Sequence, residues 1–262
     1  MEQSPHVMKF GDKLLSRCRY GWMLSSGPFI GKCFELYGEY SESEVSIFKS
    51  YVTLGNYVID VGANMGDLTL PLSEIVGATG RIFAYESHPE VFNMLCANLA
   101  MNDIKNVKVI NAFVADNPNV DTSSSVWGKY AYVSENWETT FVPLDAMKLE
   151  QLNFIKVDVD GSELAVLRSG LASIKKFRPI LYFENDIKEK SQALLAFVLA
   201  LGYRIFFHPA PIFQPDNYLR NPVNAWAPKN IVSLMMLALP PKVMAPQGLR
   251  EVKSSDEWWD FG

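Results

Sequence analysis

The chain has 262 residues, of which 48% are hydrophobic and 20% are charged, and its formal net charge at pH 7 is −5. These values are typical of a globular protein with a sizeable core, and a chain of this length is often a single α/β domain. The acidic balance argues against a nucleic-acid partner, because such a partner is held by a basic surface.

The cysteines Cys18, Cys33 and Cys96 are odd in number and widely spaced. They form neither a metal-binding pattern nor a disulfide framework, which favours a reducing compartment. The N-terminus lacks the apolar stretch of a secretory signal, and no apolar run is long enough to span a bilayer. We therefore expect a cytoplasmic protein without a membrane span.

Residues 1–40 are expected to form an N-terminal arm that packs on the domain. Phe10, Leu14, Leu15 and Cys18 have a loose helical spacing, and glycines and a proline then interrupt it. These signals are mixed, and the interpretation that we favour is an arm that packs on the domain.

A helix is predicted to follow the arm. Ser41 and Glu44 have the spacing of a capping box, and Val45, Phe48 and Val52 recur on one helical face. The cap alone explains Glu44, so we assign it no catalytic role.

The stretch Tyr57–Gly66 is a β-branched run that ends in an acid and then breaks into glycines. A helical pattern begins at Asp67, so a buried strand is predicted to turn sharply into a helix. In open α/β sheets, ligands bind at the carboxyl ends of such strands. Asp60 is expected to face this crevice, and Gly62 and Gly66 would let a ligand approach the backbone closely.

The glycine turn lacks the G-x-G-x-x-G spacing that a dinucleotide pyrophosphate requires. A second predicted strand, Arg81–Glu86, ends in an acid about 20 residues after the glycines, the spacing that places a carboxylate on a ribose hydroxyl. The acid Asp60 suits a cationic ligand better than a phosphate. A ribose and a cation without a pyrophosphate together indicate S-adenosylmethionine.

Strands and helices alternate along the rest of the chain. Helices are predicted from Pro89 and over residues 188–201, and strands over residues 107–112, 154–159, 179–186, 203–208 and 231–237, with an edge strand at 139–142. This order predicts an α/β fold with a mostly parallel sheet and helices on both faces.

The end of the strand at 154–159 carries several acids. Asp158 should face the crevice, whereas Asp160 and Glu163 stand in a D-G-S-E sequence that also fits a capping box. We favour a cap for Glu163 and leave both roles open for Asp160. Asp145, after a proline, has the character of another helix cap.

Three motifs resemble the FkbM-type methyltransferases: D-V-G-A-N-M-G, the strand that ends at Glu86, and I-K-V-D-V-D-G-S-E over residues 155–163. The resemblance extends from about Tyr37 to about Leu239. It implies a Rossmann-like class I methyltransferase fold, with a last antiparallel strand between the fifth and sixth strands. It also implies an S-adenosylmethionine-dependent enzyme that methylates hydroxyls on sugars or polyketides. The family usually carries Glu at Asp160, so the role of that carboxylate does not transfer directly.

The cofactor-binding candidates lie at the strand ends and in the glycine turn: Asp60, Gly62, Ala63, Asn64, Gly66, Glu86, Asp116 and Asp158. In the family, an acid or polar group at the position of Asp116 lies near the adenine, although a turn aspartate explains this residue equally well. A comparable N-terminal segment helps to close the cofactor site, which makes Tyr37 and Glu39 further candidates.

A hydroxyl acceptor must lose a proton during methyl transfer, so a general base is expected near the methyl group. The catalytic candidates are His208, Asp158 and Glu184, all at predicted carboxyl ends of strands. His208 has the unperturbed pKa nearest neutrality, but simple packing beside aromatic neighbours also explains it. Lys156 could face away from the site because side chains alternate along a strand.

The oxygen donors Asp158, Asp160, Glu184 and Asn185 could bind Mg²⁺, but their spacing does not demand it, and we expect no required metal.

Two segments and the tail carry less defined signals. Residues 117–137 combine polar residues with Trp127, Tyr130, Tyr132 and Trp137, which fits either a surface loop or an acceptor-binding lid. Residues 209–230 are too long for a routine connection and are expected to be functional. From Pro240 the chain is expected to be a disordered tail, with docking of its aromatic residues on the body or on a second subunit of a homodimer as the alternative.

The function that these patterns indicate is methyl transfer from S-adenosylmethionine to a hydroxyl of a small molecule, a sugar unit or a secondary metabolite. The alternatives are an N-methyltransferase, a nicotinamide-dependent oxidoreductase and a non-catalytic cofactor-binding module. The missing G-x-G-x-x-G spacing counts against the oxidoreductase.

Overall fold

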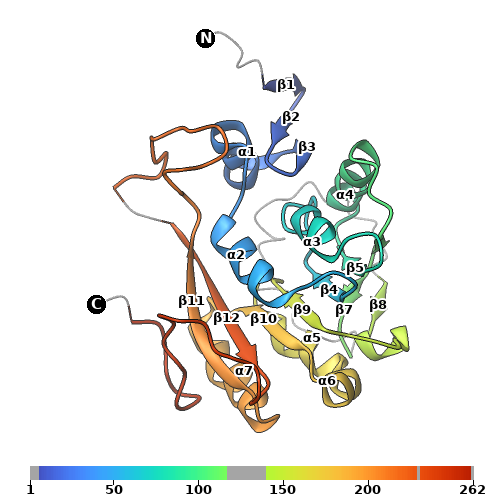
Figure 1. Cartoon of the computed structure of the whole chain (residues 1–262), viewed down its shortest axis with the longest axis vertical. Coiled ribbons are helices and arrows are strands. Elements are labelled where there is room, and N and C mark those ends of the chain that lie inside the picture. The colour runs from blue at the N-terminus through green and yellow to red at the C-terminus, as the bar shows by residue number, and fades with distance from the viewer. Residues whose placement is uncertain (1–5, 117–139, 229–230, 261–262) are drawn as a thin grey trace.

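The computed structural model describes residues 6–116, 140–228 and 231–260 (Figure 1). The predicted lid over residues 117–137 and Phe261 of the tail lie outside the described residues. No helix in the described ranges is long and apolar enough to cross a membrane.

A seven-stranded sheet forms the centre of the described structure, in the order β11-β12-β10-β9-β4-β5-β6. Its strands are β4 (Tyr57–Val61), β5 (Arg81–Tyr85), β6 (Val107–Ile110), β9 (Phe154–Val157), β10 (Ile180–Glu184), β11 (Arg204–Pro211) and β12 (Val232–Leu239). β12 runs antiparallel to both β10 and β11, whereas the pairs among β4, β5, β6, β9 and β10 are parallel. The predicted fold class, with its antiparallel strand between the fifth and sixth strands, is confirmed.

Helices cover both faces of this sheet (Figure 1). One face packs on α2 (Glu42–Tyr51), α3 (Thr69–Val76) and α4 (Pro89–Met101), and the other packs on α5 (Glu163–Ser169), α6 (Leu171–Phe177) and α7 (Lys188–Ala200). Because side chains alternate along a strand, Val58 of β4 enters the first core and Ile59 enters the second.

The N-terminal arm is a three-stranded antiparallel sheet of β1 (Val7–Phe10), β2 (Lys13–Cys18) and β3 (Gly21–Ser25). The loose helical spacing of Phe10, Leu14, Leu15 and Cys18 therefore does not correspond to a helix. The arm is held to α4, where Asn98 Oδ1 accepts from the Leu24 N–H at 2.7 Å and Asn102 Oδ1 accepts from the Trp22 N–H at 2.8 Å. A π-helical turn, η1 (Gly27–Gly31), and α1 (Lys32–Tyr37) then lead to α2.

The start of α2 differs from the predicted capping box. Ser41 is left-handed, with φ of 46°, and its hydroxyl donates to Glu44 Oε1 at 2.7 Å rather than capping the helix backbone. Glu44 is 1% exposed, and its Oε2 has no hydrogen-bond partner among the described residues. Burial, together with the negative charge of Asp158, raises the pKa of Glu44 to about 8.

Two other predicted caps have different outcomes. Glu163 is the first residue of α5, and its Oε1 accepts from the N–H groups of Val159 and Gly161, so it stabilises the turn before the helix rather than capping the helix itself. Asp145 lies in a short 3₁₀ helix, η3 (Leu144–Met147), but its carboxylate accepts from Ala172 and Ser173 at the start of α6. β7 (Phe113–Val114) and β8 (Phe141–Val142) form a separate two-stranded parallel sheet.

The C-terminal tail docks on the domain as far as the structure describes it, so the expected disorder is wrong there. The Val252 N–H donates to Ile205 O at 2.8 Å, which covers the free edge of β11. Trp259 packs edge-on against Phe207, and its indole donates to Asn185 O at 2.7 Å.

Gly62 follows β4 and must be glycine for two reasons. Its φ is +75°, and a Cβ there would lie 1.9 Å from the carbonyl oxygen of Asp158. The end of β9 therefore approaches the turn more closely than any side chain allows.

We expect Gly62→Ala to destabilise the protein far more than Gly202→Ala. Gly202 has the same φ of +75° but open space around it, so its variant carries only the left-handed penalty of about 1–2 kcal/mol. The clash at Gly62 should add a further ~1–3 kcal/mol or more. Unfolding free energies from urea titration would measure the difference, and equal losses in both variants would contradict the close approach.

Glu44→Gln should make stability less dependent on pH. The folded pKa of Glu44, about 8, lies above its ordinary value of 4.5, so the folded state holds a proton that the unfolded state releases between these values. This stabilising effect is complete below pH 4.5 and is lost as the pH rises towards 8, at up to about 1.4 kcal/mol per pH unit. The variant should therefore gain on the wild type in thermal unfolding as the pH rises through this window. Glu150→Gln, at an exposed position, controls for the substitution itself, and a Glu44→Gln difference that stays constant with pH would refute the expectation.

Candidate functional site

A cavity of about 1140 Å³ lies at the carboxyl ends of the parallel strands. The turn after β4, the ends of β5, β9 and β10, the start of β12 and the N-terminal arm all contribute to its lining. Pockets for one small ligand usually measure about 300–1,000 Å³, so this cavity has room for a cofactor and a second molecule.

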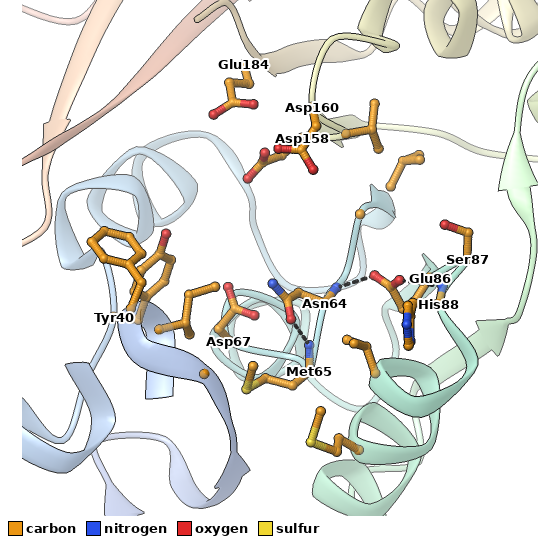
Figure 2. Close-up of a pocket in the computed structure, with 18 of the residues that line it drawn as sticks. Tyr40, Asn64, Met65, Asp67, Glu86, Ser87, His88, Asp158, Asp160 and Glu184 are labelled. Carbon is orange, nitrogen blue, oxygen red and sulfur yellow. Dashed lines mark hydrogen bonds between the residues drawn. The ribbon is translucent and has the colours of Figure 1, made fainter. Parts of the chain in front are cut away.

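Glu86, at the end of β5, lines this cavity beside the glycine turn (Figure 2). Its Oε2 accepts from the Asn64 N–H at 2.9 Å, and its Oε1 accepts from the His88 N–H at 2.8 Å. Burial raises the pKa of Glu86 to about 7. These two hydrogen bonds fix the Glu86 carboxylate against the glycine turn.

Asp60 does not line the cavity, so the prediction that it faces the crevice is wrong. Its side chain is fully buried, accepts from Thr69 Oγ1 at 2.7 Å and lies 3.3 Å from Lys156 Nζ. The alternation of β4 explains this, because Asp60 shares a face with Val58 and enters the layer beneath α3. Asp60 therefore binds Thr69 and Lys156 beneath the glycine turn and does not reach the cavity.

Lys156 of β9 occupies the centre of this buried layer. It is 2% exposed, and its Nζ donates to Gly62 O at 2.8 Å and lies 3.7 Å from Asp158. Burial alone would lower its pKa, but the carboxylates of Asp60 and Asp158 outweigh burial and raise the pKa of Lys156. Lys156 does not line the cavity, which agrees with the suggestion that it faces away from the site.

Asp158, Asp160 and Glu184 line the opposite side of the cavity from Met65 and Asp67 (Figure 2). Glu184 Oε2 is buried and has no hydrogen-bond partner among the described residues. Burial and the nearby negative charges of Asp158 and Asp186 raise the pKa of Glu184 well above its ordinary range. The structure therefore brings two of the three catalytic candidates, Asp158 and Glu184, to one wall.

The third catalytic candidate, His208, lies outside the residues that line the cavity. It is 6% exposed, with Nδ1 2.7 Å from the Tyr182 hydroxyl and Nε2 3.2 Å from Ser43 Oγ. Burial lowers the pKa of His208 to about 4, so the ring is uncharged at neutral pH. Its contacts hold β11, β10 and α2 together, which is the packing role that the sequence had left open.

The remaining cofactor candidates are distributed around the turn. Gly62 and Asn64 line the cavity, whereas Ala63 and Gly66 are buried behind it. Asp116 is exposed and lies outside the lining.

Tyr37 and Glu39 bind the segment that follows β11. The Tyr37 hydroxyl donates to Val223 O at 3.1 Å, and Glu39 accepts from the Tyr218 N–H at 2.7 Å. These contacts pack the long segment of residues 212–228 on the N-terminal arm.

Several residues that line the cavity were not predicted from the sequence, among them Tyr40, Met65, Asp67, Ser87 and His88. Asp67 follows the glycine turn directly, and Ser87 and His88 follow Glu86. Adjacency to the recognised motifs was the signal that could have identified these three residues.

Comparison with known proteins supports a methyltransferase. The family described as the methyltransferase FkbM domain matches residues 60–205, more than half of the chain. No curated protein matches the sequence.

Similar folds occur among solved structures. The precorrin-6y C5,15-methyltransferase from Geobacter metallireducens shares 12% identity with a TM-score of 0.50, over 75% of this chain and 88% of that one. A methyltransferase FkbM from Methylobacillus flagellatus shares 16% identity with a TM-score of 0.49, over 75% of this chain and 50% of that one. The match to the family model over more than half of the chain shows that the chain belongs to the FkbM family of S-adenosylmethionine-dependent methyltransferases.

Proposed function

We propose that the enzyme transfers the methyl group of S-adenosylmethionine to a hydroxyl of a small hydroxylated acceptor, such as a sugar unit or a secondary metabolite. The observation that carries this proposal is the arrangement of the cavity. Glu86 and the glycine turn form one side, and Glu184, with an unpartnered carboxylate oxygen, forms another. The volume of about 1140 Å³ suits a cofactor and an acceptor together.

In this proposal the Glu86 carboxylate accepts hydrogen bonds from the ribose hydroxyls, and the cofactor crosses the turn at Gly62 and Asn64. Ala63 and Gly66 shape the turn from behind, and Asp60 supports it through Thr69. Asp158 lies where its negative charge would stabilise the sulfonium.

Methyl transfer from a sulfonium depends mainly on alignment, because the leaving group is already activated. The acceptor oxygen forms a bond to the methyl carbon as the carbon–sulfur bond breaks, and S-adenosylhomocysteine leaves. Glu184 takes the hydroxyl proton at its unpartnered oxygen. The positive charge of the cofactor favours the ionised form of nearby carboxylates, so binding prepares Glu184 to act as a base.

The same wall also suits an amine acceptor. Asp158, Asp160, Glu184 and Asp186 all line it, and a cationic amine would be attracted to this charge. Mass spectrometry of the product, with fragmentation to locate the new methyl group, separates the two acceptors.

Glu86→Gln should weaken the binding of S-adenosylmethionine about 10- to 100-fold, because it removes charged hydrogen bonds to the ribose. Isothermal titration would measure this affinity. Glu90→Gln is the matched control, because Glu90 lines the same cavity but is exposed on α4. If Glu86→Gln binds S-adenosylmethionine with wild-type affinity, the ribose does not bind to Glu86.

Glu184→Gln should lower kcat about 10²- to 10⁴-fold while leaving the cofactor affinity nearly unchanged, because the amide cannot accept the proton. The measurement is S-adenosylhomocysteine formation with a panel of sugars and polyols. Glu189→Gln, at an exposed position on α7, is the control. If Glu184→Gln turns over like the wild type, the base lies elsewhere.

A further inference from the structure

Asp67 is a buried carboxylate that the proposed chemistry leaves unused. It stands between Gly66 and α3, is 7% exposed and lines the cavity. Its Oδ1 is fully buried and has no hydrogen-bond partner among the described residues. A buried carboxylate oxygen without a donor is costly, so its position on the cavity wall points to a donor supplied by a ligand.

The surrounding charges do not compensate Asp67. Lys156 forms its ion pairs with Asp60 at 3.3 Å and with Asp158 at 3.7 Å, and no ion pair of Asp67 occurs in the described part of the chain. Burial raises the pKa of Asp67 to about 7, although Lys156 opposes this shift. A cationic group bound beside Asp67 would offset the free-energy cost of burying its negative charge.

The position of Asp67 relative to Glu86 identifies which part of the cofactor it would meet. Figure 2 shows the two carboxylates on opposite sides of the turn at Asn64, with Tyr40 on the side of Asp67. A cofactor whose ribose lies at Glu86 therefore extends its methionine part towards Asp67. Of the two cationic groups of that part, the sulfonium has no N–H or O–H to donate, whereas the α-ammonium has three donors.

We propose that Asp67 binds the α-ammonium group of S-adenosylmethionine and is a cofactor-binding residue of this enzyme. The inference rests on the proposed function, because it uses the placement of the ribose at Glu86. In this arrangement Glu86 and Asp67 hold the two ends of the cofactor, and the sulfonium lies between them above the glycine turn.

The test is isothermal titration of the full-length wild type and of Asp67→Asn with three probes. The probes are S-adenosylhomocysteine, its analogue without the α-amino group, and 5′-deoxy-5′-methylthioadenosine, which lacks the whole amino acid. Asp67→Asn should weaken S-adenosylhomocysteine about 10- to 100-fold, as expected for the loss of a charged hydrogen bond. The affinities of the other two probes should change by less than about twofold.

Two further measurements keep the test independent of how the variant folds. In the wild type, removal of the α-amino group alone should weaken binding about as much as the substitution does, and equal affinity for both homocysteine probes would overturn the inference. The melting temperature of ligand-free Asp67→Asn should equal or exceed that of the wild type, because the substitution removes an uncompensated buried acid. A structural role for Asp67 would instead lower it.

The outcomes separate this inference from the proposed function. If Asp67→Asn weakens all three probes alike, or none of them, the role of Asp67 is refuted and the ribose at Glu86 stands. If Glu86→Gln binds methylthioadenosine as the wild type does, the placement of the ribose fails. If the wild type binds no S-adenosylhomocysteine, both proposals are refuted.

Discussion

The buried ammonium of Lys156 is the interaction on which the site depends. It donates to Gly62 O and lies within 4 Å of carboxylate oxygens of Asp60 and Asp158, so it ties the turn after β4 to the end of β9. Four carboxylates raise its pKa despite its burial, and it therefore stays charged. A charge in such surroundings persists only when it is paired, which makes the positions of these groups strongly interdependent.

This layer also explains the electrostatics of the cavity above it. Lys156 pairs with two acids, but Glu44 and Asp67 lie close enough to influence it without pairing with it. Each of these two acids keeps a buried oxygen without a hydrogen-bond partner among the described residues. Of these two acids only Asp67 lines the cavity, and the proposed binding of the cofactor's α-ammonium group would give its carboxylate a donor.

Much of the fold could be predicted because its signals are local. The β-branched run before Gly62, the glycines and the helical pattern after them predicted the strand–turn–helix unit, and the spacing to Glu86 predicted the second acid of the site. Contacts between segments that are distant in the sequence could not be predicted in this way. The strands of the N-terminal arm are anchored by Asn98 and Asn102 of α4, and the tail is held by the free edge of β11. No local pattern indicates such pairings, so the strands of the arm were not predicted and the tail was expected to be disordered.

The sequence by itself determined the order of the strands and helices of the central sheet, the glycine turn, the family and the cofactor, because each depends on patterns within short stretches of the chain. Only the tertiary structure decided which acids face the cavity. Asp60 and Glu86 both belong to strand ends, yet the alternation of β4 buries Asp60 under α3 while Glu86 lines the cavity. Only the packing of β10, β11 and α2 shows that His208 is enclosed by Tyr182 and Ser43, whereas Glu184 lines the cavity. Side-chain direction at a strand end depends on register and on what packs above it, and both are set by segments far away in the sequence.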